Sequence, residues 1–330
     1  MSRPTVSAVF AAYNATWCIA RAIDSLLAGT VVPEEIIVCD DGSTDGMPEY
    51  IEGKYGGRVQ VLRLPHRNAA AARRDGLAIA KGDWLAFIDA DDWWTPEKLE
   101  RQLAFLEKHP QVRWLSTDGD YVAEEGVVKE SWLGDYFQPV RERTGDLFEP
   151  LVHRCFPLLS SMIVEREAYH AVGGIDPTIV YSHDYDLWLR LAARHPGGLM
   201  TDKLVHYWFH AAALSRNFDA RHRDNLVIME RVAAGAYRAE PELRALGAVR
   251  AAGLAYDVGI AAIRAGKYGE GRAFLARARD AGPARRRAIA TFGSLVPAPL
   301  MKPLMQMSWL KQLVLRERPT APVLKGGGGA

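Results

Sequence analysis

The sequence has few cysteines, no long apolar run and almost no net charge. Its only cysteines are Cys18, Cys39 and Cys155, which form no CxxC pair, so we predict neither a disulfide framework nor a structural zinc site. The 41 Lys and Arg residues balance 40 Asp and Glu residues, and the formal net charge is +1. No overall field therefore favours nucleic acid or another strongly charged partner.

The beginning of the chain carries no targeting signal. "MSRPTVSAVFAAYN" has neither the basic region nor the long apolar core and small-residue cleavage site of a signal peptide. No uninterrupted apolar run approaches the ~18 residues that span a bilayer. We therefore expect a cytoplasmic protein. The sequence gives no indication of its oligomeric state.

The first hundred residues alternate between two periodicities. Val-, Ile- and Phe-rich runs, typical of strands, occupy 5–11, 34–40, 59–64 and 83–89. Segments with helical spacing lie between them: 17–29 ends at Gly29, and 68–82 begins at Asn68, a good N-cap, and ends at Gly82. This alternation predicts an α/β sandwich whose parallel sheet is covered by helices on both faces.

The pattern changes after residue 110. We predict two antiparallel strands at 112–122 and 126–134, a strand at 158–165, a helix at 182–195 and a last strand at 203–210. From about Leu214 onward strand signals disappear, and two helices broken at Gly266 resemble a tetratricopeptide-like hairpin. We expect a first domain at 1–213, a helical region at 214–324 and a disordered tail at 325–330.

Carboxylates follow two of the predicted strands directly. Asp40 and Asp41 end the second strand, and Asp89, Asp91 and Asp92 end the fourth. The carboxyl ends of parallel strands meet at one edge of a sheet, where ligands bind. Carboxylates gathered there raise one another's pKa, and Mg²⁺ or Mn²⁺ would remove the conflict. A turn capped by Asp45 or Thr44, or an acidic helix start, explains either cluster alone but not both.

Four segments in order resemble a known family. "VSAVFAAYN", "EEIIVCDDGSTD", "RNAAAARRDGLAIAKGDWLAFIDADD" and "SHDYDLWLRLA" are similar to the successive signatures of family 2 glycosyltransferases, over about residues 5–215. The resemblance implies a GT-A fold, a Rossmann-like nucleotide-binding α/β/α sandwich, here with an α-helical C-terminal extension. It also implies an inverting hexosyl- or deoxyhexosyltransferase. Such an enzyme moves a sugar from a nucleoside-diphosphate-sugar donor to a hydroxyl of a glycan or lipid-linked glycan.

The resemblance assigns the donor site. It places Ala11, Tyr13 and Asp40 or Asp41 near the base and ribose, and we favour Asp40 as the contact to the base. Arg73 becomes a nucleotide-binding candidate, whereas Arg74 fits a solvated helix face. Asp89 takes a ribose or supporting role. A UDP-sugar is the favoured donor, with GDP- and dTDP-sugars as alternatives.

The resemblance also assigns the metal and the base. Asp91 would bind Mn²⁺ or Mg²⁺, His210 would be a further metal or phosphate contact, and Asp92 could assist or cap the next helix. Asp184 would be the general base that takes the acceptor proton. His183 stands where many relatives carry Glu, and could alter acceptor contacts. Among the tryptophans, Trp94 is a candidate acceptor contact or supporting residue, while Trp93 and Trp132 could stack on sugars or pack in the core.

Two other functions and one membrane question stay open. A sugar-nucleotide nucleotidyltransferase normally has a Gly-rich basic loop after its first strand, which "FAAYNATW" lacks. A non-catalytic nucleotide-binding or interaction protein would leave Asp91 and Asp184 without a purpose. The segment 300–319 is apolar with interspersed Lys and Arg. It could lie on the inner face of the membrane or pack against the rest of the chain.

Overall fold

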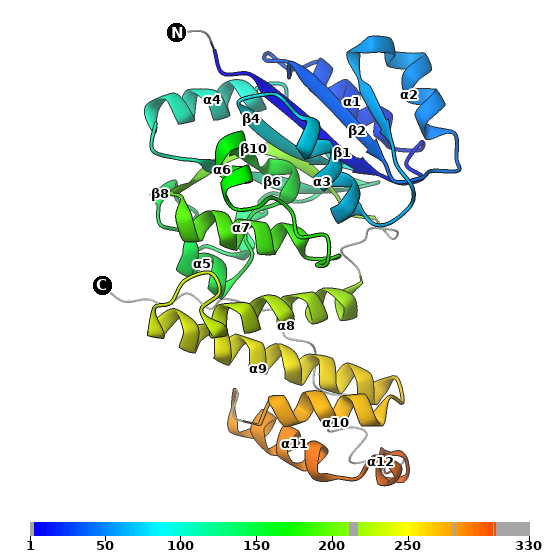
Figure 1. Cartoon of the computed structure of the whole chain (residues 1–330), viewed down its shortest axis with the longest axis vertical. Coiled ribbons are helices and arrows are strands. Elements are labelled where there is room, and N and C mark those ends of the chain that lie inside the picture. The colour runs from blue at the N-terminus through cyan, green and yellow to red at the C-terminus, as the bar shows by residue number, and fades with distance from the viewer. Residues whose placement is uncertain (1–2, 211–216, 280–281, 306, 308–330) are drawn as a thin grey trace. The chain divides into compact units, whose positions relative to one another are not determined.

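The computed structural model describes residues 3–210, 217–279, 282–305 and 307 (Figure 1). The chain divides into two compact units, Met1–Ala213 and Leu214–Ala330. Each unit is described by itself.

Ten strands among the described residues form one mixed sheet in the first unit. They are β1 (Val6–Ala12), β2 (Glu35–Asp40), β3 (Gln60–Arg63), β4 (Trp84–Asp89), β5 (Trp93–Trp94), β6 (Trp114–Ala123), β7 (Gly126–Lys129), β8 (Arg143–Gly145), β9 (Ile163–Glu165) and β10 (Gly197–Trp208). The order across the sheet is β3-β2-β1-β4-β9-β6-β10-β5, with β7 beside β6 and β8 beside β10.

The acidic ends of β2 and β4 lie at the same edge of the sheet although the two strands are not neighbours. β1 lies between β2 and β4 and is parallel to both, so that Ala12 pairs with Asp40 and Ala11 pairs with Asp89. β9 is antiparallel to both β4 and β6, and β6 is parallel to β10. The carboxyl ends of β1, β2, β4, β6 and β10 therefore meet at one edge, which we call the carboxyl edge.

Two of the strand predictions need correction. Only Ile163–Glu165 of the segment 158–165 is a strand, because Leu159–Ser161 forms the short 3-10 helix η3. The last strand begins at Gly197, six residues before the predicted start at 203, and ends at Trp208. The predicted antiparallel pair is confirmed as β6 with β7.

Helices cover both faces of the sheet, as the sequence predicts (Figure 1). On one face, α1 (Ile19–Leu27), α2 (Met47–Tyr55) and α4 (Lys98–Lys108) bury their apolar sides against β1, β2 and β4. On the other face lie α3 (Ala69–Ile79), α6 (Arg166–Ala171) and α7 (His183–Arg194). Phe87 of β4 meets Tyr169 of α6 and Trp188 of α7 there. The short α5 (Phe148–His153) accepts a hydrogen bond from Tyr185 of α7.

Small residues let α3 lie close to the sheet. Asn68 caps this helix, and its side chain accepts a 2.8 Å hydrogen bond from the amide of Ala71. A Cβ on Gly76 would overlap the Cys39 sulfur and would lie 2.9 Å from Val9 Cγ1. This close packing fixes the height of Arg73 above the ends of the strands.

The described part of the second unit is helical. It contains α8 (Phe218–Ala234), α9 (Pro241–Arg264), α10 (Tyr268–Arg277), α11 (Ala284–Leu295) and α12 (Ala298–Met305). Gly266, at φ +76°, breaks α9 from α10 as predicted. These two helices pack closely, since a Cβ on Gly271 would lie 2.5 Å from Ile263 Cγ1.

Membrane-related features of the second unit are limited. Among the described residues, α9 is the one helix long and apolar enough to cross a bilayer, and 56% of its most apolar window is buried inside the fold. Such burial is typical of a packed helix of a globular domain. Most of the segment 300–319, and all of the tail 325–330, lie outside the described residues.

Replacing Gly76 with Ala is expected to destabilise the first unit. The added methyl meets Cys39 and Val9 in a filled space, so the free energy of unfolding should fall by ~1–3 kcal/mol. Gly53→Ala in α2 is the matched control, because its Cβ meets nothing within 4 Å, and it should stabilise by up to ~1 kcal/mol. Chemical denaturation of both variants measures this difference. Equal effects would show that α3 is not tightly packed on the sheet.

Candidate functional site at the carboxyl edge

Three carboxylates meet at the end of β4. Asp89, Asp91 and Asp92 each offer an oxygen, and these atoms lie within 4.8 Å of one another. Burial, followed by the neighbouring charges of Asp91 and Asp89, raises the pKa of Asp92 well above its usual range. Burial also raises the pKa of Asp89 to about 6. Since 40% of the Asp89 side chain is exposed, solvent offsets part of that penalty.

Asp92 is held by neutral hydrogen-bond donors. Its Oδ2 accepts from the Ser160 hydroxyl at 2.5 Å, and its Oδ1 accepts from the Trp208 amide at 3.0 Å. The same hydroxyl accepts from the amide of Asp89 at 3.0 Å. Ser160 thus ties two members of the acidic cluster together. Its only sequence signal is a Ser pair inside an apolar run.

Asp89 is held by Arg73. The Arg73 guanidinium donates to Asp89 Oδ1 at 2.5 Å and to His183 Nε2 at 2.9 Å. Burial, and then the charge of Arg73, lowers the pKa of His183 to about 4, so the ring is neutral at pH 7. The contact of His183 Nδ1 with the Val180 carbonyl at 3.1 Å fits a proton on Nδ1 and a free acceptor on Nε2. Arg73 is only 1% exposed, which places it beneath the edge rather than in an open groove.

Asp91 is paired with a histidine, a residue that can also bind a metal ion. Its Oδ2 lies 2.8 Å from His210 Nε2, and its main-chain oxygen accepts from Arg21 at 3.0 Å. The carboxylate oxygen and the imidazole nitrogen together suit Mn²⁺. Mg²⁺ prefers oxygen ligands and would use the carboxylate of this pair. The residues therefore fit a divalent cation, and Asp91 with His210 would hold it.

The ends of β1 and β2 form the neighbouring part of the edge. Asp40 accepts from the amide of Ser43 at 3.0 Å, and Asp41 accepts from the amide of Arg67 at 2.8 Å. Both carboxylates are buried. Tyr13 stacks on His66 with ring centroids 4.3 Å apart. The structure brings Tyr13 and both carboxylates to the carboxyl edge together with Ala11, and which carboxylate contacts a base stays a prediction.

Two acids in the first turn of α7 have different surroundings. Asp186 is fully buried and pairs with Arg190 at 2.7 Å, so it has a structural role. Asp184 is half-buried and makes no side-chain hydrogen bond within the described part of the chain. The charge of Asp184 adds to the raised pKa of Asp89 and partly offsets the lowering of the pKa of His183, so Asp184 lies close to both groups.

Trp94 does not face the edge. Its indole is 4% exposed and donates to the Ser160 carbonyl at 2.9 Å, with Lys98 lying over the ring. Burial excludes stacking of Trp94 on a sugar. Its connection to the acidic cluster runs through Ser160.

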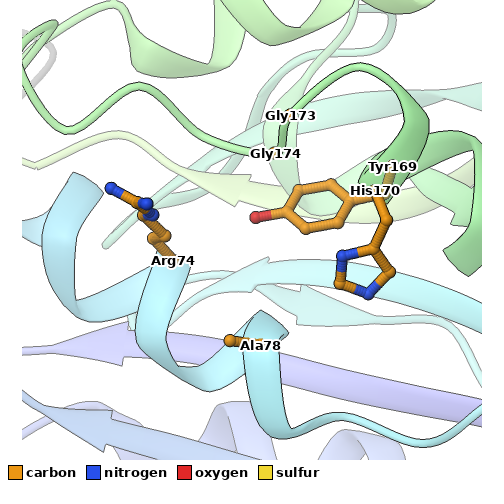
Figure 2. Close-up of a pocket in the computed structure, with 6 residues that line it drawn as sticks. All are labelled: Arg74, Ala78, Tyr169, His170, Gly173 and Gly174. Carbon is orange, nitrogen blue, oxygen red and sulfur yellow. The ribbon is translucent and has the colours of Figure 1, made fainter.

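A separate hollow of about 240 Å³ lies between α3 and α6 (Figure 2). It is lined by Arg74, Ala78, Tyr169, His170, Gly173 and Gly174. Arg74 is exposed at its rim, in agreement with a solvated helix face. None of the acidic cluster lines this hollow, so the chemistry locates the site at the carboxyl edge instead.

One sheet covered by helices on both faces, with an acidic cluster at its carboxyl edge, agrees with the architecture of the GT-A class. The sequence matches the family model "Glycosyl transferase family 2" over residues 7–166. A relative named "Putative glycosyltransferase EpsE", from Bacillus subtilis (strain 168), is 31% identical over 193 residues, 57% of this chain and 67% of EpsE. The chain therefore belongs to glycosyl transferase family 2, and its fold is GT-A.

Other relatives differ in how much of their length is matched. WfaP of Escherichia coli, named UDP-Glc:alpha-D-GlcNAc-diphosphoundecaprenol beta-1,3-glucosyltransferase, is 29% identical over 214 residues, 64% of this chain and 80% of WfaP. Chondroitin synthase of Pasteurella multocida (strain Pm70) is 27% identical over 233 residues, but only 23% of its length is matched. S. aureus TarS 1-349 in complex with UDP-GlcNAc has a TM-score of 0.63 over 93% of this chain and 92% of that chain. At 15% identity, this likeness shows the fold alone.

The stability of the ion-free protein is expected to depend on the titration of Asp92. Its folded pKa is raised above the usual 3.8. The contribution of protonated Asp92 to the free energy of unfolding is therefore fully present below pH 3.8, and it is lost as the pH rises through the folded pKa. Asp92→Asn, which mimics the protonated acid, should gain stability relative to wild type between pH 4 and 8, by at least about 1 kcal/mol. Urea denaturation with EDTA measures the difference. A constant difference across this range would show that Asp92 is ionised without penalty.

Proposed function

We propose that this protein is an inverting glycosyltransferase that moves a hexose or deoxyhexose from a nucleoside-diphosphate sugar to a hydroxyl acceptor. One observation carries the proposal. A pair able to hold a metal, Asp91 with His210, belongs to the same cluster of charges at one sheet edge as Asp184, whose carboxylate makes no side-chain hydrogen bond within the described part of the chain.

A UDP-sugar is the donor we favour. The name of WfaP gives UDP-Glc as its donor, and TarS has been solved with UDP and with UDP-GlcNAc. In this chain, Tyr13 and the buried carboxylates Asp40 and Asp41 would meet the base and ribose, with Ala11 alongside. GDP- and dTDP-sugars are the competing donors.

The chemistry follows from where the side chains lie. Asp184 takes the proton from the acceptor hydroxyl as its oxygen attacks the anomeric carbon, and a single displacement inverts the configuration. Asp91 and His210 would hold Mn²⁺ or Mg²⁺, and the ion would stabilise the negative charge on the departing diphosphate. Arg73 keeps Asp89 ionised and in place, while neutral His183 adds no further charge beside Asp184.

We propose a glycan, and in particular a lipid-linked glycan, as the acceptor. The printed acceptor of WfaP is GlcNAc linked to diphosphoundecaprenol. An acceptor of that kind would bring a cytoplasmic enzyme to the inner face of a membrane. In this proposal residues 1–213 form the catalytic domain, and the helical region 214–324 serves docking or acceptor selection.

Nucleotide titrations with two matched variants test the proposal. Calorimetry with UDP, GDP and dTDP, each with Mn²⁺ and with EDTA, should show metal-dependent binding of one nucleotide to wild type. Asp91→Ala should abolish this dependence, because it removes the carboxylate ligand. Asp184→Asn should bind the same nucleotide with unchanged affinity.

Turnover tests the assigned general base. With the matching sugar nucleotide, Asp184→Asn should lose at least ~100-fold in kcat, the range expected for removing a general base. Retained transfer in this variant would contradict the assigned base. Binding of no nucleotide by wild type, or binding indifferent to metal and to Asp91, would favour a non-catalytic protein.

A further inference from the structure

Three tryptophan rings and one arginine are stacked beside Asp91, and the stack extends from the sheet to the surface. The guanidinium of Arg21 lies 3.7 Å from the centre of the Trp93 ring and 3.9 Å from that of Trp208. The centre of the Trp208 ring in turn lies 5.1 Å from that of the Trp17 ring. We call Trp93, Arg21, Trp208 and Trp17 the aromatic ladder. Its outer member, Trp17, is 56% exposed.

Trp17 is held firmly in spite of its exposure. Its ring meets the edge of His210 at 5.2 Å and 72°, in addition to its contact with Trp208. A rigid exposed indole loses little conformational freedom when a ligand covers it, so it can contribute its full apolar area to binding.

The loop that carries Trp17 is fixed as well. The amide of Asn14 donates to Ser43, the amide of Thr44 donates to the Asn14 side chain, and the amide of Thr16 donates to Asp45, at 2.8–3.0 Å. Asn14 adopts φ +49°, a conformation that these bonds support. The loop after β1 and the loop after β2 therefore form one unit.

We propose that the exposed face of Trp17 is a binding platform for a sugar ring. The inference rests on the proposed function, because the ring contacts His210, a member of the candidate metal pair. A pyranose has an apolar C–H face that matches an indole, and hydroxyls that suit polar surroundings. Thr16, next to Trp17 in the sequence, and its hydrogen-bond partner Asp45 supply polar neighbours here, whereas a lipid chain would require a continuous apolar surface.

The sugar could belong to the donor or to the acceptor, and two titrations distinguish the sources. In the first, UDP, UDP-glucose and UDP-N-acetylglucosamine are titrated with Mn²⁺, and the sugar contribution is the ratio of the Kd of UDP to that of the tighter sugar nucleotide. In the second, the methyl glycosides of glucose and N-acetylglucosamine are titrated into protein saturated with UDP and Mn²⁺. The full chain is used throughout.

Trp17→Ala should leave the Kd of UDP within about twofold of wild type and weaken sugar binding by about tenfold in one of the two titrations. Trp17→Tyr, which retains an aromatic face, should preserve most of that binding. Tyr50→Ala is the matched control, because Tyr50 is an exposed aromatic residue of α2 that makes no ring contact with Trp17, Trp208 or His210 within the described residues. It should change neither titration.

Two results would overturn the platform alone. If Trp17→Ala weakens UDP as much as the sugar, the ring acts only by holding His210 in place. If neither titration changes, the exposed face binds no sugar. If wild type binds GDP or dTDP in place of UDP, both titrations use that nucleotide and its sugar forms. A wild type that binds none of the three nucleotides with Mn²⁺ overturns the proposed function and the platform together, which separates that failure from a failure of the platform alone.

Discussion

Mutual repulsion among three carboxylates at the end of β4 is the constraint on which the rest of the site depends. Each acid is stabilised differently: Asp92 by neutral donors, Asp89 by a buried guanidinium, and Asp91 by an imidazole. Buried polar groups persist only when they are paired in this way. The partners come from distant parts of the chain, so folding of the unit and assembly of the site are one event.

The partners of the three acids also determine which of them is available to a cation. Asp92 and Asp89 are committed to protein partners, which leaves Asp91 with His210 as the pair that a cation can enter. Through Arg73, the cluster is connected to His183 and thereby to the first turn of α7. The proposed base, Asp184, and the proposed metal pair can then belong to one cluster of charges without a direct hydrogen bond between them.

The sequence predicted much of this arrangement because strand periodicity and the acidic strand ends are local signals. The strands β1 to β4, the cap at Asn68 and the break at Gly266 follow from patterns within about fifteen residues. Ser160 could not be found this way, because its role depends on the antiparallel insertion of β9 between β4 and β6. Arg21 was missed for the same reason: its partners are Trp93 and Trp208, and only the sheet order brings them together. For Trp94, burial rules out stacking on a sugar and leaves the supporting role, a choice that the sequence left open because exposure cannot be read from a residue type.

The most direct test of this account is the position of a bound cation. Crystals of the protein with Mn²⁺ and UDP, measured for anomalous scattering at the manganese edge, would locate the ion without assumptions about the ligands. The account predicts one peak within bonding distance of Asp91 and His210, with Asp89 still paired to Arg73. A peak elsewhere, or bound UDP with no peak at the acidic cluster, would contradict it.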